Sequence, residues 1–185
     1  MTQTHIQRCE WIQGKPDYYV AYHDNIWGVA EHDDQKLFQW LILESFHVGL
    51  SWQLVLSKKE AFMKAFDQFD YNKVAQYDER KIEALTQNAD IIRHRGKIKA
   101  AIMNAQAFIK VREEFTSFDD YIWGFVNREP VVKKTDEHVT QSALSDAVTK
   151  DMKRRGFKFI GSITIYSYLQ AIGIINDHDL HCDFR

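Results

Sequence analysis

The sequence contains no apolar stretch long enough to span a lipid bilayer, and its first residues, MTQTHIQRCEW, lack the apolar core of a secretory signal. We therefore expect a cytoplasmic protein without a membrane partner. Sustained strand alternation, low-complexity runs and internal repeats are also missing, which favours an all-α fold. At 185 residues, of which 45% are hydrophobic, the chain suits a single domain over residues 1–185. Nothing in the periodicity demands a partner subunit, so a monomer is expected.

Cysteine is scarce, because only Cys9 and Cys182 are present, near opposite ends of the chain. A disulfide between them is not expected in a cytosolic protein. Each has a histidine within reach, His23 after the first and His178 before the second. Two cysteines and two histidines would form a closed, structural zinc site that clamps the termini together, although two free core thiols would fit the spacing too. Other histidines could replace one of this pair: His5 and His181.

The chain has no excess of positive charge, since its formal net charge is −2. That value alone argues against a polyanionic partner such as nucleic acid. Cations are nevertheless concentrated in two segments: Arg93, Arg95, Lys97 and Lys99 in one, and Lys150, Lys153, Arg154, Arg155 and Lys158 in the other. Either cluster alone would be a solvated face, but the two together make a phosphate-binding surface plausible.

The segment from Leu37 to Leu56 carries the most unusual pattern. Helical spacing places Glu44 within an apolar stripe that also holds Leu37, Trp40, Leu41 and Val48. Gly49 then permits a turn, and Ser51 can cap a second helix. Glu44 could be a structural carboxylate held by backbone amides or an arginine. The first third of the chain is rich in aromatic residues, which indicates a pocket for a flat ligand as readily as a core: Trp11, Tyr18, Tyr19, Tyr22, Trp27, Trp40 and Trp52.

Helices are predicted through the rest of the chain. Asp70, Asp78 and Ser117 are suited to cap helix N-termini, and Ser57-Lys58-Lys59-Glu60 has the form of a capping box. Residues 143–155 form a basic helix, residues 156–161 a glycine-bounded apolar turn, and residues 163–172 a further helix. This is the pattern of a helix-hairpin-helix, about 143–173, which binds DNA phosphate with backbone amides, although an ordinary helical hairpin has the same pattern.

Five motifs together, AYHDNIWGV, LESFHVGLSW, IIRHRGKI, RRGFKFIG and NDHDLHC, resemble the 3-methyladenine DNA glycosylase I family of bacterial alkylation-repair enzymes. The resemblance extends from Cys9 to Cys182. It implies a helix-hairpin-helix glycosylase fold with its termini clamped by one structural Zn2+. It also selects the zinc ligands from the wider set, in the 9–23 and 178–182 segments: Cys9, His23, His178 and Cys182.

The resemblance also implies roles for other residues. Glu44 matches the pocket carboxylate of the family, and Leu50 matches the side chain that fills the gap in the duplex. The aromatic residues around the base would be Trp11, Tyr19, Tyr22, Trp27 and Trp52. Phe46 stands where the family commonly has glutamine. A phenylalanine there could narrow the pocket, remove a hydrogen bond or simply pack behind Glu44; we place it among the pocket residues, and the departure bears on substrate specificity. From the basic segments and the hairpin we expect DNA contacts at Arg93, Arg95, Lys97, Lys158 and Gly161.

The implied activity is base excision repair by a hydrolase. The enzyme would flip N3-methyladenine out of alkylated double-stranded DNA and bind it against Glu44, and water would leave an abasic site and free 3-methyladenine. No lyase step is expected, and neither is a catalytic role for Asp177 or Asp179, which flank His178. The alternative is a non-catalytic, zinc-stabilised helix-hairpin-helix protein that binds DNA lesions, and release of the free base would distinguish the two.

Overall fold

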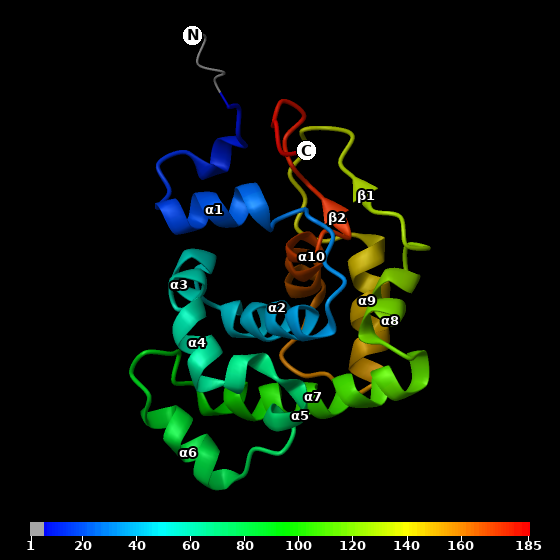
Figure 1. Cartoon of the computed structure of the whole chain (residues 1–185). Coiled ribbons are helices and arrows are strands. Elements are labelled where there is room, and N and C mark those ends of the chain that lie inside the picture. The colour runs from blue at the N-terminus through cyan, green and yellow to red at the C-terminus, as the bar shows by residue number, and fades with distance from the viewer. Residues whose placement is uncertain (1–5) are drawn as a thin grey trace.

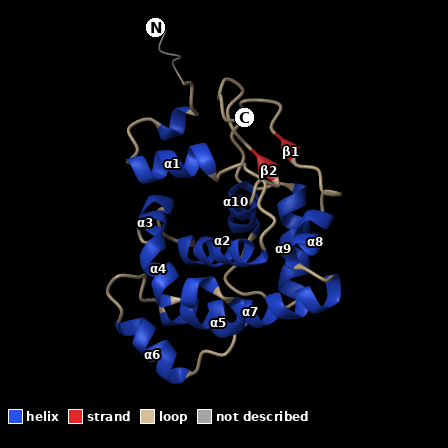
Figure 2. Ribbon diagram, viewed as in Figure 1, coloured by secondary structure: helices blue, strands red, loops and turns tan. Residues whose placement is uncertain are grey.

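Helices make up most of the computed structural model, which describes residues 6–185 (Figures 1 and 2). The α-helices are α1 (Asp17–Asn25), α2 (Asp34–His47), α3 (Trp52–Ser57), α4 (Lys59–Ala65), α5 (Tyr71–Val74), α6 (Glu79–Gln87), α7 (Arg95–Phe115), α8 (Phe118–Gly124), α9 (Ala143–Arg154) and α10 (Ser162–Ala171). Two 3-10 turns, η1 (Glu10–Ile12) and η2 (Asp67–Phe69), and two short strands, β1 (Val131–Val132) and β2 (Ile175–Asn176), complete the fold. Within the described range, no helix has the length and hydropathy to cross a membrane.

Helix α2 lies at the centre of the fold, where it packs against α3, α7, α8 and α10 (Figure 1). Every residue from Leu37 to Phe46 is buried, so this helix is enclosed on all sides rather than along one stripe. The prediction for Val48 was wrong, because α2 ends at His47 and Val48 is 40% exposed. Gly49, with φ of +78°, then turns the chain into α3, whose N-cap Ser51 accepts a hydrogen bond from the Leu54 amide, as expected.

The predicted N-caps are confirmed at three helices. Asp70, Asp78 and Ser117 each accept a hydrogen bond from the first turn of α5, α6 and α8. The capping box at Ser57 is wrong, because Ser57 is the last residue of α3 and its hydroxyl donates to the Leu54 carbonyl at 2.7 Å. Helix α4 begins at Lys59 without a side-chain cap.

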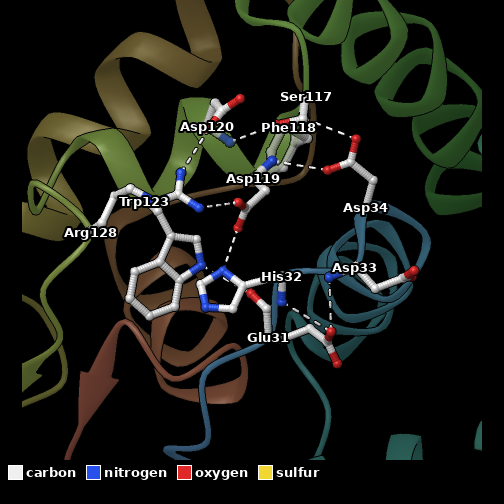
Figure 3. A network of polar contacts seen from close by, with 10 residues as sticks. All are labelled: Glu31, His32, Asp33, Asp34, Ser117, Phe118, Asp119, Asp120, Trp123 and Arg128. Carbon is white, nitrogen blue, oxygen red and sulfur yellow. Dashed lines mark hydrogen bonds and ion pairs between the residues drawn. The ribbon is translucent and has the colours of Figure 1, made fainter.

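The beginnings of α2 and α8 are joined by a polar network (Figure 3). The Asp34 carboxylate accepts from the amides of Phe118 and Asp119 at 3.1 and 2.9 Å, which satisfies free N–H groups of α8 from a neighbouring helix. The Asp119 carboxylate in turn meets His32 Nδ1 at 2.7 Å and accepts from Arg128 at 2.5 Å. The network therefore fixes the start of the 128–140 loop relative to α2.

The short strands place that loop against the C-terminal segment. β1 and β2 pair in parallel, with Val131 opposite Ile175, and the Lys133 amide donates to the Asn176 carbonyl at 2.9 Å. This pair was not predicted, because two residues are too few to show alternation. The two termini also meet, since the Gln7 amide donates to Asp183 at 2.8 Å and the Glu10 amide donates to Asp179 at 3.0 Å.

The α9–turn–α10 segment has the predicted helix-hairpin-helix arrangement. Gly156 has a φ of +98° at the end of α9, a conformation that favours glycine. The turn is held by Asn104 of α7, whose side chain donates to the Lys158 carbonyl at 3.1 Å and accepts from the Lys158 amide at 2.7 Å. Because Asn104 is fully buried, these bonds fix the hairpin to the core.

Candidate functional site

A cavity of about 180 Å³ lies between α1, α2, α3 and α10. Its volume is below the roughly 300–1,000 Å³ of pockets for drug-sized ligands, so it suits a small, flat molecule. The structure brings together here the carboxylate and aromatic residues that the sequence pointed to: Glu44, Trp11, Tyr19, Tyr22, Trp27 and Trp52.

The aromatic side chains form a connected wall that comes from several elements. Trp11 of η1 packs edge-on against Trp27, with ring centroids 4.9 Å apart, and also contacts Tyr19 of α1 at 5.7 Å. Tyr22 of α1 lies 5.5 Å from Trp52 of α3. These three contacts are tilted or edge-on, so the rings support one another, and all of them line the cavity.

Glu44 projects from α2 into this wall, and its side chain is 2% exposed. Its only hydrogen bond within residues 6–185 is with His47 Nδ1, 3.1 Å from Oε2. Burial raises the pKa of Glu44, and the hydrogen bond from His47 opposes that rise. Among the described residues, Glu44 therefore has neither the arginine nor the backbone amides that would hold a structural carboxylate.

The hydroxyls near Glu44 are neutral donors at physiological pH. Burial, and then the charge of Glu44, raise the pKa of Tyr19 to about 12, and the same two causes raise the pKa of Tyr22. A ligand that carries positive charge would therefore meet the Glu44 carboxylate beside neutral aromatic groups in this part of the cavity.

The cavity is also lined by charged residues that were not predicted to belong to it. It includes Lys133 and His138 from the 128–140 loop and Asp177 and Asp179 from the C-terminal segment. Lys133 Nζ lies 3.7 Å from Asp177 Oδ1 and 3.6 Å from Asp179 Oδ1, with only 9% of the lysine side chain exposed. The lysine therefore offsets part of the charge of these aspartates. No sequence signal could have found it, because the β1–β2 pair brings the loop to the cavity.

Phe46 does not border the cavity, contrary to our expectation. It is fully buried, and its ring lies 4.8 Å from that of Phe62 and 5.9 Å from that of Phe66. Two residues along a helix differ by about 200° in direction, so Phe46 faces the opposite side of α2 from Glu44. Its packing supports the helix that carries Glu44.

A second, open groove of about 580 Å³ runs between the α2–α3 turn and the hairpin. The predicted residues Leu50 and Gly161 both line it, and Leu50 is 38% exposed at the tip of the turn. Gly161 is the N-cap of α10 and provides no side-chain cap, so the first amides of α10 have no such partner. This arrangement suits a phosphate group beside an exposed apolar side chain.

The predicted cationic contacts fall into different environments. Arg93 and Lys158 are exposed, with no ion-pair partner within the described part of the chain. Arg95 is paired with Glu79 and Glu83 of α6. Lys97 is 5% exposed, and its Nζ donates to the carbonyls of Phe46 at 2.8 Å and Val48 at 2.5 Å. The prediction that Lys97 contacts DNA is therefore wrong, because its charge caps the C-terminus of α2.

Replacing Lys97 with methionine is expected to lower the free energy of unfolding by about 2–4 kcal/mol, since the carbonyls of Phe46 and Val48 lose a charged donor. Urea unfolding would measure this. The matched variant is Arg93→Gln, which is expected to leave stability unchanged but to reduce the slope of log K against log salt for DNA binding by about 1. A Lys97→Met protein with normal stability and a reduced salt slope would contradict the structural role of Lys97, and an unchanged salt slope in Arg93→Gln would contradict the DNA contact at Arg93.

A candidate metal centre joins the two ends of the chain. Donor atoms of Cys9, His23 and Cys182 all lie within 4.8 Å of one another, and all three residues are buried. Cys182 Sγ is 3.7 Å from His23 Nε2. Burial raises the pKa of the Cys9 thiol to about 12, so a thiolate at this place needs an adjacent cation.

His178 is suited to be a fourth ligand. Its ring centroid lies 4.8 Å from that of His23, and its Nε2 is buried without a hydrogen-bond partner among the described residues. Both histidines use Nδ1 elsewhere, His23 with Asp24 at 2.7 Å and His178 with Asn176 at 2.9 Å. Each ring therefore has Nε2 free for a metal, with an oxygen partner on Nδ1 that fixes its orientation.

Of the two alternative histidine ligands, only His181 lies among the described residues. His181 is exposed and is not part of the cluster. His5 lies outside the described residues. The donor set of sulfur and imidazole nitrogen fits a tetrahedral, structural metal site.

Comparison with known proteins gives concordant results. A family model described as methyladenine glycosylase matches residues 11–185. The DNA-3-methyladenine glycosylase 1 of Escherichia coli (strain K12) is 46% identical over 180 residues, which cover 96% of this chain and 96% of the relative.

Solved structures agree with the sequence comparison. A crystal structure of 3-methyladenine DNA glycosylase I superimposes with a TM-score of 0.92 at 44% identity, covering 96% of this chain and 98% of the other. The 3-methyladenine DNA glycosylase I of Staphylococcus aureus, in a structure that addresses recognition of 3-methyladenine, gives a TM-score of 0.89 at 36% identity, with 92% of each chain covered.

Proposed function

This chain belongs to the methyladenine glycosylase family, and from that membership we infer that it removes 3-methyladenine from DNA. The assignment of the site rests on Glu44. This buried carboxylate lines an aromatic cavity, and His47 is its only hydrogen-bond partner in the described chain. Methylation at N3 gives adenine a positive charge, and a buried carboxylate with aromatic faces is suited to bind it.

The base has to leave the duplex before it can reach this cavity. Extruding a nucleotide costs a few kcal/mol, and a side chain that fills the gap offsets part of that cost. Leu50 is exposed beside the groove, and the first amides of α10 lie along the same groove, so Leu50 would enter the duplex while the hairpin holds a phosphate. Arg93 and Lys158 are the exposed cations that would contact neighbouring phosphates.

The chemistry that remains is hydrolysis of an already weakened glycosidic bond. Glu44 would accept hydrogen bonds from the polar edge of the base and stabilise its charge, while Tyr19, Tyr22 and the tryptophans hold its faces. Water would then complete the reaction, leaving an abasic site and free 3-methyladenine. Among the described residues, Lys133 is the lysine that lines the cavity, and it is engaged with two aspartates rather than free to act as a nucleophile. We therefore propose a monofunctional glycosylase.

The metal centre would be a structural zinc site with Cys9, His23, His178 and Cys182 as ligands. When bound, the zinc would join the N-terminal segment to the C-terminal segment. Trp11 and Trp27 lie against the histidine ligands, with Trp11 5.3 Å from His23 and Trp27 4.6 Å from His178. The clamp would thus hold one wall of the base cavity.

The test of function is release of 3-methyladenine from methylated duplex DNA by the folded, zinc-loaded protein, detected chromatographically. We expect the free base and an abasic site, without a borohydride-trapped adduct. A trapped adduct would contradict the monofunctional mechanism. Binding to methylated DNA without release of the base would favour a non-catalytic lesion-binding protein instead.

A further inference from the structure

His47 lies between the cavity that contains Glu44 and the groove that Leu50 lines. It is the last residue of α2, and its Nδ1 lies 3.1 Å from Glu44 Oε2 on the cavity side. The same residue lines the groove beside Leu50, with 30% of its side chain exposed. Its ring centroid is 5.3 Å from that of Trp52, another residue of the cavity wall. One imidazole is therefore in contact with both parts of the site.

The direction of the hydrogen bond follows from the chemistry of the pair. When Glu44 is ionised its carboxylate can only accept, so in that state Nδ1 of His47 carries the proton and donates it to Glu44 Oε2. The other carboxylate oxygen has no partner within residues 6–185 and remains available to a ligand. A hydrogen bond to the charged form of a carboxyl favours that form.

We propose that His47 is a positioning residue for Glu44, which holds one carboxylate oxygen so that the other faces the base, and which keeps the carboxylate ionised for a cationic ligand. This inference rests on the proposed function, because it assigns His47 a part in binding the methylated base. His47 itself need not touch the base.

Within residues 6–185, His47 is the one group that forms a hydrogen bond with Glu44. The remaining titratable groups that face the pair come from α1, α7, the 128–140 loop and the C-terminal segment: Tyr19, Tyr22, Lys97, Lys133, His138, Asp177 and Asp179. The tyrosines are neutral, Lys133 is paired with the two aspartates, and Lys97 is bonded to the carbonyls on either side of His47. Burial raises the pKa of Glu44, so without His47 the carboxyl would hold its proton to a higher pH.

Two substitutions separate this role from simple packing. His47→Phe keeps a ring that can pack on Trp52 but removes the donor, whereas His47→Asn removes the ring and places an amide N–H near the position of Nδ1. Single-turnover release of 3-methyladenine from methylated duplex DNA is followed from about pH 5 to pH 9 for the wild type and both variants. Circular dichroism and urea unfolding confirm that each protein is folded.

We expect the acid limb of the His47→Phe profile to move upward by about one pH unit, with release about 10-fold slower on that limb, and the limb of His47→Asn to lie near that of the wild type. Overlapping profiles for His47→Phe and the wild type would overturn the proposal, as would a defect in His47→Asn alone.

If the wild type releases no base, the proposed function fails. Affinity for free 3-methyladenine then decides the role of His47: weaker binding by His47→Phe, restored in His47→Asn, supports it, and equal affinities overturn it.

Discussion

Replacing Glu44 with glutamine is expected to slow the release of 3-methyladenine by about 100-fold or more, the usual loss when one preorganised electrostatic group is removed from an active site. Glutamine preserves the shape of the side chain and one acceptor oxygen. It removes the negative charge of Glu44. The other acids that line the cavity within residues 6–185, Asp177 and Asp179, are both paired with Lys133 and do not replace that charge. Single-turnover kinetics on methylated duplex DNA is the measurement.

The matched control lies on the opposite face of the same helix. Phe46→Leu removes contacts with Phe62 and Phe66 and is expected to lower the free energy of unfolding by about 1–2 kcal/mol while leaving the rate of base release unchanged. Together the variants distinguish the cavity face of α2 from its packing face. If Glu44→Gln releases the base as fast as the wild type, the charge of Glu44 has no part in catalysis and recognition must rest on the aromatic wall.

Replacing either cysteine with serine is expected to remove one bound zinc ion per chain and to lower the free energy of unfolding by more than about 4 kcal/mol, in the range typical of a lost structural metal. For a chain of this size, a loss of about 4 kcal/mol corresponds to a fall in Tm of about 8–16 °C. The reason is that the cluster of Cys9, His23 and Cys182 joins segments at opposite ends of the sequence. Metal analysis of Cys9→Ser and Cys182→Ser, with thermal unfolding followed by circular dichroism, provides the check.

His181→Ala is the control for this experiment, since His181 is exposed and lies outside the cluster. It should retain zinc and full stability, whereas His178→Ala should lose affinity for the metal because it removes the unpartnered Nε2. Zinc bound equally well by His178→Ala and the wild type would remove His178 from the ligand set. Binding should also weaken in acid, where protons compete with the metal for the thiolates and imidazoles.

Local signals in the sequence were sufficient for most of the helices. Asp70, Asp78 and Ser117 begin helices because a short polar side chain beside a free amide acts over a few residues, independent of the rest of the fold. Ser57 shows the limit of such signals, because its hydroxyl has a second acceptor within α3 and bonds there instead. The all-α class and the helix-hairpin-helix pattern follow from the same short-range rules.

The sequence by itself thus determined the helices, the helix-hairpin-helix pattern and the grouping of Glu44 with its aromatic neighbours. Periodicity, caps and family motifs each depend on residues close together in the chain, so they can be recognised without the tertiary structure. Only the tertiary structure decided which side chains meet. It placed Phe46 behind Glu44, enclosed Lys97 under the end of α2, and carried Lys133 to the cavity through a two-residue strand pair. Burial and charge pairing depend on contacts between residues far apart in sequence, and such contacts leave no periodic trace in the chain itself.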